Sequence, residues 1–329
     1  MKINQVLTLL IALLFSNATF AQTGINYYEL ANAAYDSGDY QKSAELFVQA
    51  FNKPVDERAK MYAAYNAACS FSLNGYKKEA IKYAKAALDN GMLQFKEDKD
   101  FDNIKNKGKF KKIIKAAAKK ITELESPASM LPITYTPKGY KKEVAHPLIV
   151  ILHGYGGNPT NIMELYKPLA DARGAILLSC RGSEITTANS FYWDYDNEEA
   201  LTFLRRQIES TIKKFNVDMQ KVILTGFSQG GYLTYDFGLK NADIFTALLP
   251  VAGKVPQKLM PHQEANKNIK VYSIAGLQEP KSFLKTYEGL DEQLDQLAIE
   301  YQLKFYNIGH QYPNNNEEEL LKAFDWLVE

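Results

Sequence analysis

One six-residue motif constrains the fold of this chain more than any other stretch. Gly-Phe-Ser-Gln-Gly-Gly at residues 226–231 follows an apolar run at 222–224 and precedes a helical stretch. Gly-x-Ser-x-Gly between a strand and a helix is typical of a nucleophile elbow, a tight turn that holds a serine above a sheet. Glycine on both sides of the serine avoids side-chain atoms where backbone segments come close. We therefore predict that Ser228 is presented to a ligand rather than packed.

The elbow lies in a region where short apolar runs alternate with helical stretches. The runs occupy residues 147–152, 175–179, 221–225, 245–251, 269–274 and 303–308. This alternation predicts βαβ units and a mostly parallel sheet that is buried on both faces. We expect an α/β domain over residues 138–329. Prolines at positions 127, 132 and 137 indicate that residues 126–137 form a linker and the entry to the first strand.

The preceding region, residues 22–125, has a helical pattern, with apolar residues at intervals of three and four. Residues 38–50 and 75–86 look like copies of one another. Matching positions in the two copies are each 36 residues apart: Tyr40 and Tyr76, Phe47 and Tyr83, and Ala50 and Ala86. The small-then-aromatic pattern resembles tetratricopeptide repeats, whose period is about 34 residues. We expect an all-α repeat domain, which either binds a protein or peptide partner or only packs as a cap.

The first 21 residues have the pattern of a secretory signal peptide. Lys2 supplies a positive charge, residues 6–15 are apolar, and small side chains at Thr19 and Ala21 fit cleavage after Ala21. The apolar segment is too short to span a bilayer, although an uncleaved anchor is an alternative. We expect an exported protein, periplasmic or secreted, with no integral membrane span after cleavage.

Charge and cysteine content narrow the classes of partner. The chain has 39 Lys and Arg residues against 38 Asp and Glu residues, a formal charge of +1. This balance provides no electrostatic reason to expect binding to nucleic acid. Cys69 lies in a predicted helix and Cys180 in a predicted strand of the other domain. Both read as small buried hydrophobic residues, and we expect no disulfide.

A serine nucleophile needs a base, because its alcohol is almost fully protonated near neutral pH. Of the four histidines, His310 follows the last predicted strand and precedes a terminal helix, a place from which it can reach Ser228. A carboxylate should then orient the imidazole. Glu279 is the first acid after the strand at 269–274, and a solvated loop acid is the alternative reading of it.

Two further loops are expected at the same edge of the sheet. The Gly-rich loop after residue 152 can turn the N–H of Tyr155 towards the elbow, where it would form an oxyanion hole with the N–H of Gln229. The loop at 183–196 is rich in aromatic residues. Phe191, Tyr192 and Trp193 are predicted to bind substrate there, or else to pack the loop onto its own domain.

These motifs together resemble the phospholipase/carboxylesterase branch of the α/β-hydrolase superfamily. The resemblance covers roughly residues 130–329 and is carried by Leu-His-Gly-Tyr-Gly-Gly at 152–157, the elbow motif, and Gly-His at 309–310. In that family the acid lies in His-Gly-x-x-Asp-Pro. Here residues 275–280 read Ala-Gly-Leu-Gln-Glu-Pro, so alanine replaces histidine and glutamate replaces aspartate.

The resemblance implies hydrolysis of carboxylic esters through an acyl-enzyme, without a cofactor or metal. Ser228, His310 and Glu279 would form the triad, and the substrate would be a small-molecule or glycan-linked ester. Two alternatives stay open. One is a serine peptidase of the same fold. The other is a catalytically weakened domain in a binding or scaffold protein that acts through its helical repeats.

Overall fold

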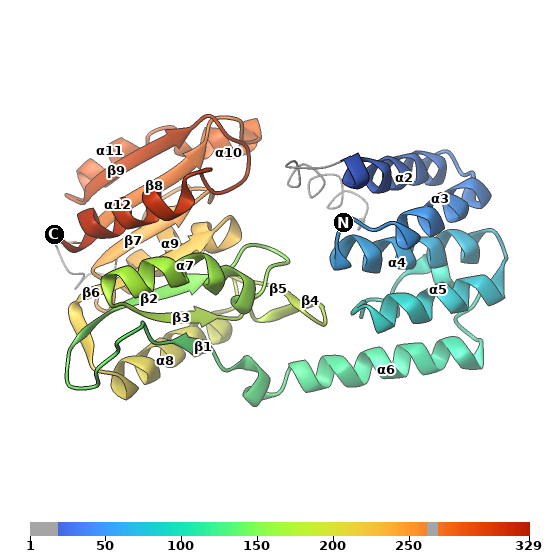
Figure 1. Ribbon diagram of the computed structural model, residues 1–329, viewed down its shortest axis with the longest axis horizontal. Coiled ribbons are helices and arrows are strands. Elements are labelled where there is room, and N and C mark those ends of the chain that lie inside the picture. Colours follow the sequence, from blue (N-terminus) through green and yellow to red (C-terminus); the bar gives the residue numbers. More distant parts are fainter. Residues whose placement is uncertain (1–18, 262–268) are drawn as a thin grey trace. The chain divides into compact units, whose positions relative to one another are not determined.

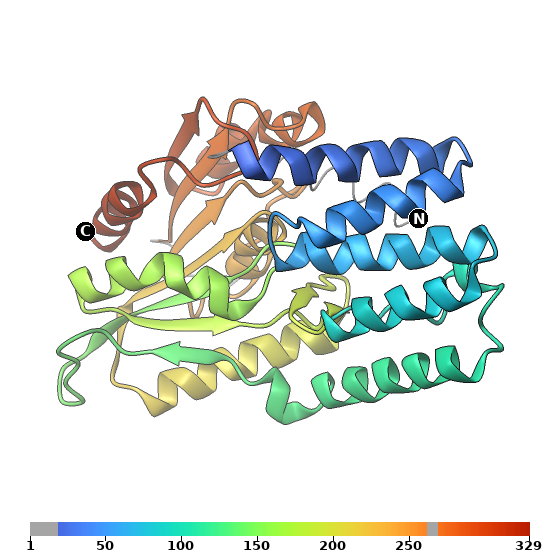
Figure 2. The same cartoon turned by 45° about the vertical axis from the view of Figure 1, so that its right-hand side comes forward.

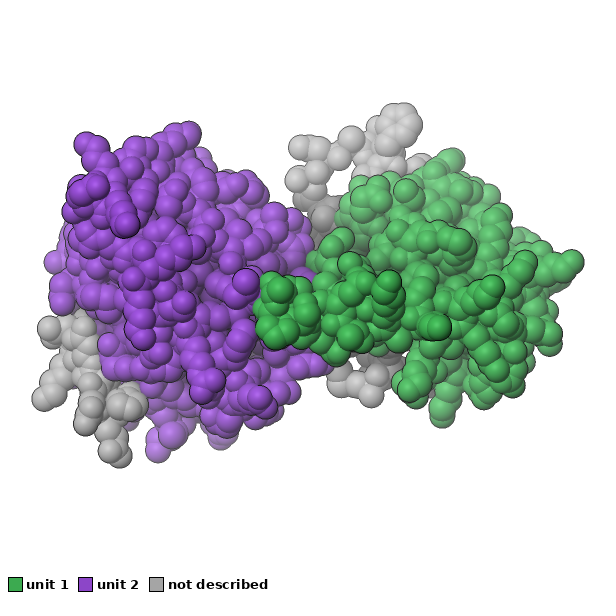
Figure 3. Space-filling model, turned by 90° about the horizontal axis from the view of Figure 1, so that it is seen from below, with its two compact units in different colours: residues 1–129, 185–189 green, residues 130–184, 190–329 purple. Residues whose placement is uncertain are grey.

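The computed structural model describes residues 19–261 and 269–329, which fall into two compact units (Figures 1 and 3). Unit 1 contains the chain up to residue 129 together with residues 185–189. Unit 2 contains residues 130–184 and 190–329. The predicted signal segment, residues 1–21, lies almost entirely outside the described residues. Among those that are described, no helix is both long and apolar enough to cross a membrane.

Unit 1 is helical, as its sequence pattern predicts. Its helices are α2 (Thr19–Asp36), α3 (Tyr40–Asn52), α4 (Glu57–Leu73), α5 (Lys77–Asp89), the 3₁₀ helix η2 (Lys99–Phe101) and α6 (Gly108–Leu124). Successive helices from α2 to α5 lie side by side (Figure 2, blue to teal). Gly38 and Gly75 occupy equivalent turns with φ of 81° and 80°. A positive φ favours glycine, so the two copies turn in the same way.

Alanine on α4 allows this close helix packing. Ala63, Ala64, Ala67 and Ala68 are fully buried. Aromatic rings fill the space beyond them, for example Phe101 against the ring of Phe110 at 5.0 Å. Small residues at the helix contacts thus bring the backbones together, and the larger rings close the core.

Unit 1 also includes a segment from much later in the chain, residues 185–189, which the sequence did not indicate. The backbone N–H of Ala188 donates to the carbonyl of Gly91 over 2.8 Å, and Thr187 forms an antiparallel bridge with Met92. The segment lies at the turn of a hairpin of β4 (Glu184–Thr187) and β5 (Ser190–Tyr192). The loop predicted to carry substrate-binding aromatics is therefore partly a strand hairpin.

Unit 2 is built on a sheet of order β1-β3-β2-β6-β7-β8-β9 in the described residues. The strands are β1 (Ile133–Tyr135), β2 (His146–Leu152), β3 (Ile176–Cys180), β6 (Val217–Phe227), β7 (Ala247–Val251), β8 (Lys270–Gly276) and β9 (Glu300–Tyr306). All neighbouring pairs are parallel except β1 with β3. The predicted α/β class is confirmed. Strand β1 lies within residues 126–137, the stretch predicted to form the linker and the entry to the first strand.

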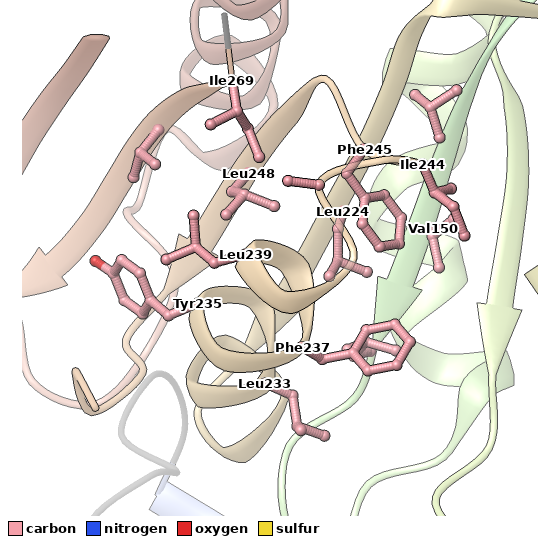
Figure 4. Close-up of a cluster of buried hydrophobic side chains, with 14 of the residues drawn as sticks. Val150, Leu224, Leu233, Tyr235, Phe237, Leu239, Ile244, Phe245, Leu248 and Ile269 are labelled. Atoms are coloured by element: carbon pink, nitrogen blue, oxygen red, sulfur yellow. The ribbon is translucent and has the colours of Figure 1, made fainter. Parts of the chain in front are cut away.

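Helices cover both faces of this sheet. They are α7 (Pro159–Arg173), α8 (Glu198–Lys214), α9 (Gln229–Lys240), the short α10 (Lys281–Leu284) and α11 (Leu290–Gln296), and α12 (Asn316–Val328). Leu148 and Val150 of β2 join a cluster with α8 and α9, whereas Ile149 and Ile151 join α7 and α12. Figure 4 shows side chains of α9 in the first cluster. Alternate side chains of a strand point to opposite faces, so an uninterrupted apolar strand requires this double cover.

Candidate active site

Ser228 lies in the turn between β6 and α9 and has a positive φ of 56°, which is rare outside glycine. A Cβ at Gly226 would lie 2.4 Å from the carbonyl oxygen of Gly230, and a Cβ at Gly230 would lie 2.2 Å from that of Leu152. The backbone N–H of Ser228 donates to the carbonyl of Val251 over 2.9 Å. The turn is thus held against its neighbouring strand, with glycines wherever backbones meet.

Ser228, His310 and Glu279 form one line of hydrogen bonds. The His310 Nε2 atom lies 2.7 Å from the Ser228 Oγ atom. The Nδ1 atom of the same ring lies 2.9 and 2.8 Å from the two carboxylate oxygens of Glu279. A carboxylate only accepts, so Nδ1 carries the proton and Nε2 is left to accept the hydroxyl proton of Ser228. The three residues predicted from separate loops are therefore brought together in the arrangement of a catalytic triad.

The loops that carry the acid and the base are packed directly on each other. The N–H of Gln278 donates to the carbonyl of Ile308 over 2.9 Å. A Cβ at Gly276 would lie 2.4 Å from the same carbonyl oxygen and 2.5 Å from that of Gly309. Only glycine therefore permits this approach at residue 276. Glu279 itself is buried, which keeps water away from its bonds to the imidazole.

The residues predicted to supply the two oxyanion donors belong to two segments that meet at Ser228. Gln229 is the first residue of α9, so its N–H has no acceptor within the helix. Tyr155 follows Gly154, and a Cβ at Gly154 would lie 3.3 Å from the Cβ of Ser228. The Gly-rich loop is held in turn by β5, because the N–H of Gly156 donates to the carbonyl of Phe191 over 2.8 Å. The loop and the elbow are thus adjacent at the carboxyl edge of the sheet.

The aromatic residues predicted to bind substrate divide into two groups. Phe191 is 6% exposed and Trp193 is 5% exposed, so neither can offer a ring face to a ligand. Phe191 packs instead under the guanidinium of Arg181, 4.4 Å from the ring centroid. Tyr192 is half-buried. For Phe191 and Trp193 this burial favours the second of the two readings given above, in which the aromatic residues pack the loop onto its own domain.

Two pairs of tyrosine rings lie in the segments around the elbow, and the sequence had indicated Tyr155 and Tyr192 of the first pair but neither Tyr195 nor Tyr232 of the second. Tyr155, 42% exposed, has its ring 5.3 Å from that of Tyr192. Tyr195, 40% exposed, has its ring 5.0 Å from that of Tyr232. Tyr232 lies one helical turn after Ser228, and its N–H donates to the Ser228 carbonyl. Tyr232 could have been identified from the sequence, because it lies one helical turn after Ser228. The position of Tyr195 instead depends on the conformation of the loop at 183–196.

A different polar cluster lies in unit 1. Among the described residues, the side chains of Cys69, Asp98 and Asp100 come close enough together to hold a metal ion. The hydroxyl of Tyr65 donates to Asp98, and burial raises the pKa of Asp100. Cys69 and Cys180 are both buried and free of disulfide bonds. The cluster shares no residue with the triad.

Comparison with curated proteins finds two relatives whose names describe them as esterases. A bifunctional acetylxylan esterase/xylanase, XynS20E, of Neocallimastix patriciarum is 25% identical over 150 residues, 43% of this chain and 21% of the relative. NocK of Nocardia uniformis subsp. tsuyamanensis, provisionally named an esterase, is 31% identical over 152 residues, 44% of this chain and 42% of the relative. The chain thus spans less than half the length of these relatives.

Solved structures support the fold of unit 2. The carboxylesterase of Bacillus cereus has a TM-score of 0.50 and 20% identity, and covers 63% of this chain and 98% of its own. Esterase PE8 has the same TM-score with 16% identity, and covers 60% of this chain and 98% of its own. Both have sequence identities that show the fold alone.

Family profiles match both parts of the chain. Residues 29–116 match a domain of unknown function, DUF6340, and this match does not test the predicted tetratricopeptide-like repeats. Residues 134–323 match the dienelactone hydrolase family, whereas the motifs had pointed to the phospholipase/carboxylesterase branch of the same superfamily. This second match covers more than half of the sequence, and the chain belongs to the dienelactone hydrolase family.

Proposed function

We propose that unit 2 is a serine hydrolase that cleaves carboxylic esters. The observation that carries this proposal is the continuous hydrogen-bonded line from Ser228 through His310 to Glu279. The esterase relatives and the esterase fold support it further. A triad of this kind is recognised by its geometry and by the role of each group, whichever fold carries it.

The proposed reaction follows from this geometry. Ser228 Oγ attacks the ester carbonyl while His310 Nε2 takes its proton, and Glu279 stabilises the resulting imidazolium. The N–H groups of Tyr155 and Gln229 donate to the oxyanion. His310 then returns the proton to the departing alcohol, which leaves an acyl-enzyme. Water, activated by the same imidazole, releases the acid and restores Ser228.

The tyrosine pairs favour an ester that carries a neutral ring. Tyr155 and Tyr195 are 42% and 40% exposed, and a sugar or aromatic ring can stack on an accessible tyrosine ring. Acidic side chains lie near the partners of these tyrosines. Burial raises the pKa of Tyr192, and the charges of Glu184 and Asp194 raise it further. Burial likewise raises the pKa of Tyr232, with a smaller contribution from the charge of Asp196. Negative charge disfavours an anionic substrate. With the acetylxylan esterase among the relatives, we propose a glycan-linked ester.

Unit 1 and the N-terminus complete the proposal. We propose that the repeated hairpins are tetratricopeptide-like and offer a surface to a protein or peptide, and that the chain is exported to the periplasm or secreted. The equivalent glycine turns at Gly38 and Gly75 support the repeat. Mass spectrometry of the mature protein, with cleavage expected after Ala21, tests export. Recovery of the protein in the cytoplasmic fraction alone, with Met1 and residues 2–21 retained, would contradict it.

Active-site labelling tests the enzymatic proposal. A fluorophosphonate should label the wild-type protein and fail to label Ser228→Ala, because it reacts with an activated serine. Ser210→Ala changes an exposed serine on α8 and should leave labelling intact. An unlabelled, folded wild type would favour a binding or scaffold protein. Rates on an acetylated xyloside, ethyl acetate and a peptide anilide then separate glycan esters, simple esters and amides.

A further inference from the structure

The side chain of Gln229 makes two hydrogen bonds to one residue of the aromatic loop. Its Oε1 atom accepts from the backbone N–H of Trp193 over 2.9 Å, and its Nε2 atom donates to the backbone carbonyl of Trp193 over 2.8 Å. The amide thus pairs with Trp193 as a neighbouring strand would. Both its donor and its acceptor have partners, so the orientation of the side chain is fully determined.

Trp193 continues this connection to the Gly-rich loop. Its indole N–H donates to the backbone carbonyl of His153 over 2.8 Å, and the indole and imidazole rings lie 5.1 Å apart at 34°. Trp193 and His153 are both buried. A hydrogen bond at such a depth is shielded from water and is costly to leave unmade.

His153 anchors the near end of that loop. Its Nε2 atom accepts from the N–H of Gly182 over 2.9 Å, so Nδ1 carries the proton and donates to the carbonyl of Gly154 over 2.8 Å. Gly182 follows β3, and a Cβ there would lie 2.4 Å from the carbonyl oxygen of Tyr192. The imidazole is thus neutral, and it joins the end of β3 to the loop that presents Tyr155.

Gln229, Trp193 and His153, here called the clamp, therefore connect the segments that carry the two oxyanion donors. One donor is the backbone N–H of Gln229 itself. The other belongs to Tyr155, two residues after His153. Oxyanion donors act only when they lie about 2.7–3.1 Å from the developing charge. A misplacement of about 1 Å can cost about a hundredfold in rate.

We propose that the Gln229 side chain, Trp193 and His153 are positioning residues that set the separation of the two oxyanion donors. The inference rests on the proposed serine hydrolase function. It assigns a role to three side chains that are not members of the triad. It also explains why the loop aromatic Trp193 is buried at the edge of the site.

The decisive variant is Gln229→Glu. It keeps the backbone N–H of residue 229, but it replaces the Nε2 donor by a carboxylate oxygen facing the Trp193 carbonyl. We expect kcat on an ester to fall about a hundredfold with KM changed less than about threefold, because an oxyanion hole acts on the transition state rather than on bound substrate. Gln220→Glu makes the same charge change at an exposed site near the start of β6 and should leave both constants unchanged.

Trp193→Phe tests the clamp without adding charge. It keeps an aromatic ring in the buried site but removes the indole N–H that bonds to His153. We expect kcat and the rate of fluorophosphonate labelling to fall together by about tenfold, since both reactions place negative charge in the oxyanion hole. The pH profile of kcat/KM should keep its wild-type shape, because the bonds of the triad are not altered.

The outcomes separate the two proposals. A folded wild type that is not labelled overturns the hydrolase function and this inference with it. A labelled wild type with Gln229→Glu and Trp193→Phe at wild-type rates overturns only the positioning role. A rise in KM at constant kcat would assign the clamp to substrate binding, and this result would also overturn the positioning role. Circular dichroism and the thermal midpoint of each variant establish that rates are measured on folded protein.

Discussion

The imidazole Nδ1 atom of His310 lies almost equally far from the two carboxylate oxygens of Glu279, at 2.9 and 2.8 Å. Glutamate stands where the motif of the resembled branch has aspartate, and it reaches the ring despite the extra methylene group. The acid loop and the base loop are packed through Gly276 and Ile308, so the position of the carboxylate is set by backbone contacts. This relationship determines the first two predictions.

Replacing Glu279 by Gln should lower kcat on a good ester by about 10³- to 10⁴-fold, because the amide neither stabilises an imidazolium nor enforces the Nδ1–H tautomer. Glu279→Asp keeps the charge but shortens the side chain, and it should lose less. Steady-state kinetics on folded protein measures both. Wild-type turnover in Glu279→Gln would show that another group orients His310.

Replacing Gly276 by Ala should displace the loop that carries His310, because the new Cβ would lie 2.4 and 2.5 Å from the carbonyl oxygens of Ile308 and Gly309. We expect kcat to fall about a hundredfold, as a shift of about 1 Å does in a positioned site. Gly309→Ala is the matched control in the same pair of loops. Its Cβ meets nothing within 4 Å, and it should keep most of the activity. Equal activity of the two variants would show that the loops can separate without cost.

His153 should make the stability of unit 2 depend on pH. Burial, with a smaller contribution from the charge of Arg181, lowers its pKa from 6.5 to about 4. Above pH 6.5 His153 is neutral in both the folded and the unfolded chain, so its titration does not change stability there. Between pH 6.5 and 4 only the unfolded chain takes up the proton, so the free energy of unfolding falls by about 1.4 kcal/mol per pH unit as the solution is acidified.

The total loss of unfolding free energy caused by His153 on acidification is about 3 kcal/mol, and it is complete below about pH 4. Urea unfolding of the wild type and of His153→Gln over this range measures it. The variant should be less stable at pH 7 but should show a shallower decline on acidification. Parallel curves for the two proteins would mean that His153 is protonated equally in both states.

Ala117 on α6 is buried in the core of unit 1, whereas its neighbour Ala116 is exposed. Ala117→Leu should destabilise the helical unit by about 1–3 kcal/mol, because extra methylene groups in a close-packed core force neighbouring side chains aside. Ala116→Leu should change it by less than about 0.5 kcal/mol. Thermal unfolding of the full chain followed by circular dichroism measures both. Similar transitions would show that this side of α6 has room to spare.

The sequence by itself determined the class of the fold and the position of the tight turn that holds Ser228. These features are local: an apolar run shows a buried strand, and glycines beside Ser228 show a turn in which backbones meet. The order of the motifs along the chain then placed His310 and Glu279 after strands of one sheet. Parallel strands all end at the same edge, so their loops had to gather there.

Only the tertiary structure decided which side chains meet and which are buried. Trp193 lies in a loop whose aromatic composition suggested substrate binding. Its contacts with His153 and Gln229 nevertheless place it in the core of unit 2. Residues 185–189 pair with Gly91 and Met92, nearly a hundred positions earlier in the chain. Such contacts join segments that are distant in the sequence. No periodicity within either segment encodes them, because they depend on how the whole chain packs.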